Sequence, residues 1–234
     1  MRWLVAFRPQ FGCRRPALPL KGNRLAARTA KKPNPSASAL EACILAGGLS
    51  SRMGRDKSRV RLSGRTLLAR VRAGIKPLPV PVRVIRRDLV PRCGPIGGIY
   101  TALQTSRAAA LLFLPCDMPF LTPELLKFTI ASLRAKDRAI FMRHGELAGF
   151  PCVFRREAAL PIVERQIARS QFSLQQLAKS LRARLVHPPR GQSSQLANVN
   201  TARDLQLARL RLKGHKMFKH GLSKRPRRSR LSGC

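Results

Sequence analysis

One stretch constrains the fold of this chain more than any other. The apolar run Ala42-Cys-Ile-Leu-Ala46 leads directly into Gly47-Gly-Leu-Ser-Ser-Arg-Met-Gly-Arg-Asp-Lys57. A short apolar run that ends in glycines is typical of a buried parallel strand, and the loop after such a strand is where α/β proteins bind ligands. The sequence therefore predicts a strand over about 42–46 that ends in a ligand-binding loop.

The loop has the chemistry of a phosphate site. Gly47 and Gly48 have no Cβ, so backbone N–H groups can approach an anion closely, and Arg52 and Lys57 add two cations. Two glycines alone would fit a plain strand-to-helix turn equally well. The string has neither the Gly-Lys-Ser/Thr of the Walker loop nor the Gly-x-Gly-x-x-Gly of dinucleotide-binding proteins.

Two aspartates follow other predicted strands. Asp88 comes after the apolar run Val80–Ile85, and Asp117 comes after the continuous apolar run 108–114, which indicates a central strand with both faces covered. A carboxylate at the carboxyl end of a central strand, beside a phosphate loop, suits Mg²⁺. We therefore predict that Asp117 binds the metal and that Asp88 accepts hydrogen bonds from a base or ribose.

The strings together resemble a known family. Leu-Ala-Gly-Gly-x-Ser-x-Arg-Met-Gly-x-Asp-Lys at 45–57, Gly-Pro-x-x-Gly-Ile at 94–99, Pro-Cys-Asp-Met-Pro-Phe-Leu at 115–121 and Asn-x-Asn-Thr at 198–201 resemble the molybdenum cofactor guanylyltransferases of the nucleotidyltransferase superfamily. The likeness covers about 42–205. It implies transfer of GMP from GTP to molybdopterin with Mg²⁺ as cofactor, giving molybdopterin guanine dinucleotide and pyrophosphate.

The resemblance also assigns roles to residues. Catalytic roles fall to Arg52, Lys57 and Asp117, with Asp117 as the metal ligand. Contacts to the second substrate fall to Asn198 and Asn200, and His144 and Glu146 either touch that substrate or form a polar hairpin. Nucleotide binding falls to six residues, namely Leu45, Ala46, Gly47, Gly48, Lys57 and Asp88.

One departure from the family affects the choice of base. Family members usually place a further strand and helix between the first helix and the Gly-Pro segment, and 67–87 is too short for both. A polar residue that the family uses near the base is lost with that pair. A related transferase that uses CTP or a sugar phosphate is therefore the nearest alternative, and a member that binds nucleotide without turnover is another.

The order of predicted elements indicates an α/β fold. Strand, helix, strand, helix, strand and helix precede a mixed end, which gives a three-layer sandwich with a mostly parallel, Rossmann-like sheet. The predicted helices cover about 66–75, 96–106, 123–135, 155–168, 173–181 and a last one to 212. Thr122 is the predicted N-cap of the third helix, and Thr201 is that of the last. Residues 40–212 form the predicted domain, with basic disordered segments at 1–39 and 213–234.

The charge is extreme. The 234 residues carry 47 Lys and Arg against 10 Asp and Glu, a formal net charge of +37, and neither terminal segment contains an acidic residue. Such a field attracts polyanions such as nucleotides and phosphorylated cofactors. The resemblance to the family implies GTP and molybdopterin as substrates and molybdoenzymes or cofactor-handling proteins as partners. A non-catalytic nucleic-acid-binding protein is the alternative from another class, but aromatic residues make up only 5% and no binding motif is present.

Cysteine usage indicates a reducing compartment. The six cysteines include no Cys-x-x-Cys pair, and Cys43, Cys116 and Cys152 lie in apolar runs that predict buried thiols. No apolar run has the length of a membrane span, and the first seven residues are too few for a secretory signal. We expect a cytoplasmic protein.

Overall fold

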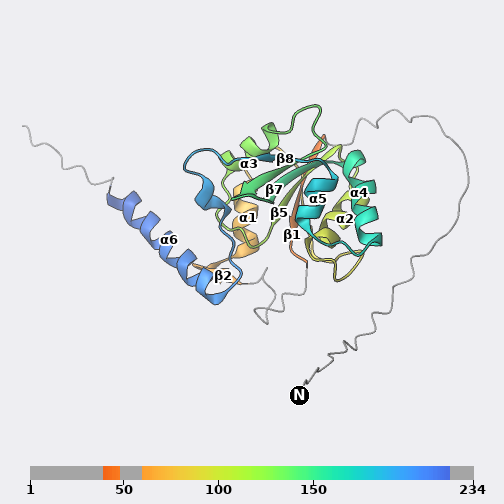
Figure 1. Cartoon of the computed structure of the whole chain (residues 1–234). Helices are drawn as coiled ribbons and strands as arrows, with labels where there is room; N and C mark the ends of the chain where they lie inside the picture. The colour runs from red at the N-terminus through yellow and green to blue at the C-terminus, as the bar shows by residue number, and fades with distance from the viewer. Residues whose placement is uncertain (1–38, 48–59, 222–234) are drawn as a thin grey trace, which may run out of the picture. The chain divides into compact units, whose positions relative to one another are not determined.

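The computed structural model describes residues 39–47 and 60–221, with side chains as far as Lys213 (Figure 1). Its centre is a six-stranded sheet in the order β4-β1-β5-β7-β6-β8. Neighbours are parallel except where β7 runs antiparallel to β5 and β6. The strands are β1 Leu40–Leu45, β4 Val82–Ile85, β5 Ala110–Pro115, β6 Ala139–His144, β7 Leu147–Arg155 and β8 Arg184–Val186.

Helices cover both faces of the sheet, which confirms the predicted sandwich (Figure 1). One core lies between the sheet and α2, α4 and α5, and a second lies between the sheet and α1 and α3. The helices are α1 Leu67–Ile75, α2 Pro95–Thr105, α3 Pro123–Ala131, α4 Arg156–Ala168, α5 Leu174–Ser180 and α6 Ala202–Gly221, with a 3-10 turn at Ser193–Leu196. No helix within the described residues is long and apolar enough to cross a membrane.

The central strand is where the sequence pattern indicated it. Leu111, Leu112, Phe113 and Leu114 of β5 are all fully buried, because helices cover both faces of the sheet at this strand. Successive side chains of the strand point to opposite faces, so Leu111 and Phe113 enter one core and Leu112 and Leu114 the other. The strand thus joins the two cores.

Local hydrogen bonds explain where α3 begins and ends. Thr122 accepts a hydrogen bond from Leu125 N, as predicted for the N-cap, and Pro123 occupies the first turn. The predicted end near 135 is wrong, because α3 stops at Ala131. Ser132 donates to Phe128 O, and Asp137 accepts from Arg134 N, so these side chains organise a turn in place of another helical turn.

Two further boundaries differ from prediction. The crossing segment before α1 contains a hairpin, β2 Arg61–Leu62 with β3 Arg65–Thr66, which the sequence analysis missed. The last helix continues to Gly221, so the predicted end at 212 is wrong and the predicted tail at 213–234 begins as helix. No proline interrupts 213–221, and of its two glycines Gly221 ends the helix while Gly214 is tolerated inside it at a cost of about 1 kcal/mol.

The region 67–87 is as short as the sequence indicated. It holds one helix, α1, and one strand, β4, before the Gly94-Pro95 turn that begins α2. Within the described residues β4 is an edge strand, with β1 as its one neighbour in the sheet. No described strand lies beyond β4, which agrees with the predicted loss of a strand and helix from this region.

Substitution of Gly74 by alanine should lower the free energy of unfolding by about 1–3 kcal/mol. A Cβ at Gly74, inside α1, would lie 2.4 Å from the backbone oxygen of Leu121, so the helix must shift from the segment that leads into α3. Without that contact, alanine in a helix would raise stability by up to about 1 kcal/mol. Urea unfolding gives the sign of the change in the free energy of unfolding. A variant more stable than the wild type would contradict the close packing of Gly74 against Leu121.

Candidate active site

Three strand ends lie level at the carboxyl edge of the sheet. Leu45 is in register with Ile85 of β4 on one side and Pro115 of β5 on the other. Ala46 N donates to Ile85 O at 2.8 Å, and Cys116 N donates to Leu45 O at 3.1 Å. The predicted nucleotide-binding residues Leu45, Ala46 and Gly47 therefore lie between the segment that leads to Asp88 and the segment that leads to Asp117.

Asp88 is pressed against glycines from two neighbouring elements. A Cβ on Gly47 would lie 3.1 Å from Asp88 Oδ1, and a Cβ on Gly97 of α2 would lie 2.9 Å from Asp88 Oδ2. Any side chain at Gly97 would therefore displace the carboxylate. The close approach joins the end of β1, the end of β4 and the start of α2 around one acidic group.

The Asp88 carboxylate has an unused acceptor. Oδ1 is buried and accepts no hydrogen bond from a described residue. Burial without a compensating donor raises the pKa of Asp88, since the charged form loses hydration. A buried acceptor without a donor is costly and rare in folded proteins, so this atom is suited to a donor that a ligand brings.

Thr101 holds the Asp88 loop in place, and the sequence analysis did not identify it. Its hydroxyl accepts from Leu89 N at 2.8 Å and donates to Gly97 O at 2.8 Å, and the residue is only 8% exposed. The hydroxyl thereby ties the residue after Asp88 to the first turn of α2. A threonine four residues after Gly97 in a helix is the available signal, since such a hydroxyl bonds the carbonyl one turn back.

Asp117 follows β5 by two residues and is half-buried. Its backbone oxygen accepts a hydrogen bond from Val199 N at 2.8 Å. The described residues contain no cluster of three or more His, Cys, Asp or Glu side chains. A single carboxylate nevertheless fits Mg²⁺, which commonly takes one or two carboxylates and fills its remaining positions with water and substrate phosphates.

The Val199 hydrogen bond brings the second-substrate candidates to Asp117. Asn198 is exposed and Asn200 is half-buried, and they flank Val199 in sequence. Asp204 Oδ2 accepts from the backbone N–H groups of Asn200 and Thr201, and Thr201 Oγ1 accepts from Asp204 N. This reciprocal cap at the start of α6 confirms the predicted role of Thr201 and lowers the pKa of Asp204.

A small third core supports this segment. It joins α6 to the β2–β3 hairpin and contains Leu62, Leu67, Val199 and Ala208. On the same side, the guanidinium of Arg211 lies 4.3 Å from the centre of the Phe120 ring, and Phe120 lies three residues after Asp117. Helix α6 thus packs against Val199 and against Phe120, which lies near Asp117 in sequence.

The structure does not describe every predicted site residue. Gly48, Arg52 and Lys57 lie outside the described residues, so their roles remain predictions. The segment 144–149 forms the polar hairpin between β6 and β7, and a contact of His144 or Glu146 with the second substrate remains a prediction. Glu146 pairs with Arg143, and His144 Nε2 lies 2.8 Å from Phe150 O.

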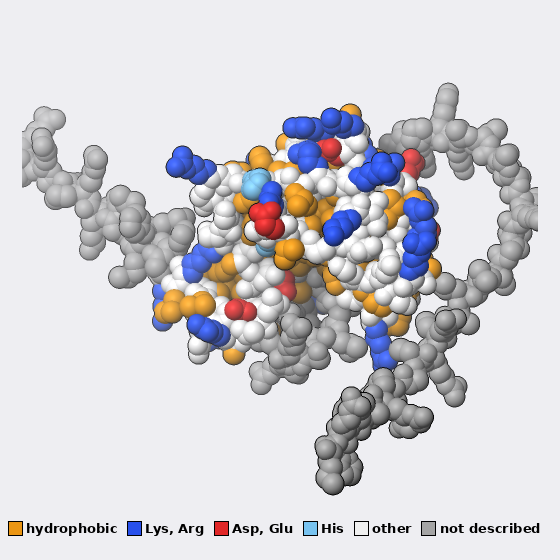
Figure 2. Space-filling view, in the orientation of Figure 1, with side chains coloured by type: hydrophobic (Ala, Val, Ile, Leu, Met, Phe, Trp, Pro, Cys, Tyr) orange, Lys and Arg blue, Asp and Glu red, His pale blue; other side chains and the backbone are white. Residues whose placement is uncertain are grey.

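The cysteines and the charge agree with the sequence analysis. Cys43, Cys116 and Cys152 are buried thiols, and Cys13 and Cys234 lie outside the described residues. Burial raises the pKa of Cys43 to about 12, so this thiol is unreactive at neutral pH. Lys and Arg side chains outnumber acidic ones on the face in Figure 2, which suits polyanionic substrates.

Comparisons with known proteins agree on one family. The MobA-like NTP transferase domain matches residues 42–187. The probable molybdenum cofactor guanylyltransferase of Opitutus terrae is 32% identical over 72% of this chain and 94% of its own length. The molybdenum cofactor guanylyltransferase of Pseudomonas syringae is 31% identical over 68% of this chain and 87% of its own length.

Solved structures agree on the fold. Molybdopterin-guanine dinucleotide biosynthesis protein A from Archaeoglobus fulgidus is similar with a TM-score of 0.64 and 21% identity, over 74% of this chain and 99% of that one. The 2-C-methyl-D-erythritol 4-phosphate cytidylyltransferase of Thermus thermophilus has a TM-score of 0.56 and 15% identity, over 74% and 98%. With its strand-end aspartates and these relatives, the chain belongs to the molybdenum cofactor guanylyltransferases of the MobA-like NTP transferase family.

Proposed function

We propose that the protein transfers GMP from GTP to the terminal phosphate of molybdopterin, which forms molybdopterin guanine dinucleotide and releases pyrophosphate. One observation carries the proposal within the family. The level ends of β4, β1 and β5 set Asp88 and Asp117 on either side of the residues that begin the phosphate loop. A nucleotide bound there can reach Asp88 with its base and Asp117 with its phosphates.

The base end of the site depends on Asp88. Guanine carries an N–H and an amino group side by side on its Watson–Crick edge, and both are donors. Oδ1 of Asp88 is buried without a described donor, so guanine would satisfy it with a charge-assisted hydrogen bond. Gly47 and Gly97 leave room for the carboxylate itself, since a Cβ on either glycine would lie within 3.1 Å of one of its oxygens.

The phosphate end depends on the loop that leaves β1. We assign the backbone N–H groups of Gly47 and Gly48, with Arg52 and Lys57, to the β- and γ-phosphates, where they stabilise the negative charge on departing pyrophosphate. Asp117 would hold Mg²⁺, which when bound neutralises phosphate charge and polarises the phosphorus. Asn198 and Asn200 orient the second substrate beside Asp117.

The reaction needs little covalent chemistry from the protein. An oxygen of the terminal phosphate of molybdopterin attacks the α-phosphorus of GTP and forms the new P–O bond. The bond from the α-phosphorus to the bridging oxygen breaks, and its electron pair leaves with pyrophosphate. The attacking phosphate is already an anion at neutral pH, so the step requires positioning and charge stabilisation more than a strong general base. We place the reaction in the cytoplasm.

CTP is the competing nucleotide, because the short 67–87 region lacks a strand and helix that the family uses near the base. The test is pyrophosphate release by the purified chain with Mg²⁺ and molybdopterin, with GTP and CTP compared. We expect release with GTP alone. Release with CTP alone would overturn the base assignment and keep the reaction class, whereas no release by folded protein would overturn the proposal.

Replacement of Lys57 by alanine should weaken GTP binding about 10- to 100-fold, since one charged contact to phosphate contributes roughly 1.5–3 kcal/mol. Titration with a fluorescent GTP analogue measures the effect. Lys136→Ala is the matched control, because Lys136 is an exposed lysine in the turn after α3. Equal affinity in the Lys57 variant and the wild type would refute the role of Lys57.

A further inference from the structure

The sheet ends in an open edge at β4. Ala42 N donates to Pro81 O and Ala46 N donates to Ile85 O, both at 2.8 Å, so Pro81 and Ile85 direct their carbonyls toward β1. Backbone groups of a strand alternate in direction, so Val82 and Val84 direct their N–H and C=O groups away from β1. Within the described residues no strand pairs with them. Such an edge is a template for another strand.

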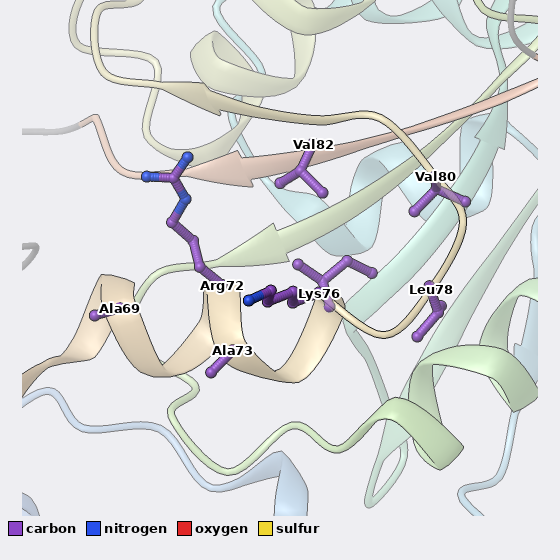
Figure 3. Close-up of a pocket in the computed structure, with 8 residues that line it drawn as sticks. Ala69, Arg72, Ala73, Lys76, Leu78, Val80 and Val82 are labelled. Atoms are coloured by element: carbon purple, nitrogen blue, oxygen red, sulfur yellow. The ribbon is translucent and has the colours of Figure 1, made fainter.

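A groove runs beside this edge. It has a volume of about 500 Å³ and lies between α1 and β4 (Figure 3). The small side chains Ala69 and Ala73 on α1 leave the space open. The apolar lining comes from four larger side chains, of which Ile75 and Leu78 are buried and Val80 and Val82 are half-buried.

Two cations border the groove. Arg72 and Lys76 belong to the last turn and the C-cap of α1, are exposed, and make no ion pair with a described residue. In Figure 3 Arg72 reaches from α1 toward the sheet, and Lys76 lies at the helix end. The surrounding segment 60–87 contains eight Lys and Arg and no Asp or Glu. The groove is therefore apolar inside and positive at its rim.

We propose that an extended acidic segment of a partner protein binds here as an added strand. Its backbone would pair with the outward groups of Val82 and Val84, alternate apolar side chains would fill the groove, and carboxylates would meet Arg72 and Lys76. The terminal segments of this chain are poor occupants, because 1–38 carries nine Lys and Arg and no acidic residue. A small anion is also a poor occupant, because it would leave the outward backbone groups of Val82 and Val84 without a partner strand.

A labelled peptide of about eight alternating Glu and Val residues tests the proposal with the full chain. Fluorescence anisotropy should show binding that weakens as salt is raised. The double variant Arg72→Glu/Lys76→Glu should bind the peptide about tenfold more weakly or worse. Its pyrophosphate release with GTP should equal that of the wild type, because neither residue is placed at the active site.

Helix α4 supplies a matched control. Arg165 and Arg169 occupy the last turn and the C-cap of α4, with the same spacing as Arg72 and Lys76 in α1. The variant Arg165→Glu/Arg169→Glu should retain wild-type peptide affinity. An equal loss in both variants would show attraction by overall charge and would overturn the proposal.

Hydrogen exchange and N-methylated peptides test whether the peptide pairs with β4 as a strand. The amides of Val82 and Val84 should gain protection from hydrogen exchange when the peptide binds, and a peptide N-methylated at alternate residues should bind no longer. Equal binding of the methylated peptide would overturn the added strand. Binding that appears only after removal of residues 1–38 would show that the chain fills its own groove and would also overturn the proposal.

Discussion

Replacement of Asp117 by alanine should reduce turnover by about 1,000-fold or more while the fold stays intact. The residue ends the turn after the central strand, and we propose it as the ligand of the metal. Loss of metal-mediated charge stabilisation costs several kcal/mol in the transition state. The backbone hydrogen bond from Val199 N to Asp117 O does not involve the substituted side chain, so the segment carrying Asn198 and Asn200 should remain.

Two measurements separate a metal role from a structural one. Pyrophosphate release should fall in Asp117→Ala, and the midpoint of thermal unfolding should stay close to that of the wild type. GTP affinity in metal-free buffer should be alike in both proteins, whereas only the wild type should gain affinity when Mg²⁺ is added. A variant that keeps its turnover, or that gains affinity with Mg²⁺ equally, would contradict the metal assignment.

The parts of the site that sequence patterns predicted are those fixed by short-range chemistry. β1 from Ala42 onward and β5 are continuous apolar runs, so their ends, and with them Gly47 and Asp117, could be placed without a structure. Thr122 and Thr201 are side-chain caps whose partners lie three residues away. Such contacts are encoded within a few residues and survive tertiary packing.

The parts that could not be predicted depend on contacts between distant segments. The setting of the Asp88 carboxylate depends on Gly47, which lies close to Oδ1, and on Gly97, which lies close to Oδ2 and belongs to a separate element. Thr101 gains its role from the loop that folds over α2. The end of α3 depends in part on Asp137, which also pairs with Arg184 of β8. Spacing within one segment carries none of this information.

The substitution Asp88→Asn should weaken GTP binding and stabilise the unliganded protein. Asparagine keeps the shape of the side chain but removes the charge, and its amide nitrogen would face donors of the base. Loss of a charge-assisted hydrogen bond should reduce GTP affinity about 10- to 100-fold. Glu146→Gln, an exposed carboxylate in the β6–β7 turn, should change neither affinity nor stability beyond the error of measurement.

The gain in stability from Asp88→Asn should depend on pH, and the raised pKa of Asp88 determines whether the gain grows or shrinks as pH rises. A carboxyl with a higher pKa in the folded protein than in the unfolded chain favours folding fully below the unfolded value, near 3.9, and loses that contribution as pH rises through the folded value. The asparagine variant should therefore unfold at a higher temperature than the wild type at pH 7, and the difference should vanish near pH 3. Added GTP should raise the unfolding temperature of the wild type more than that of the variant, since the ligand supplies the donor that Asp88 Oδ1 lacks. A variant that is less stable at pH 7 with unchanged GTP affinity would show that Asp88 serves the fold and not the nucleotide.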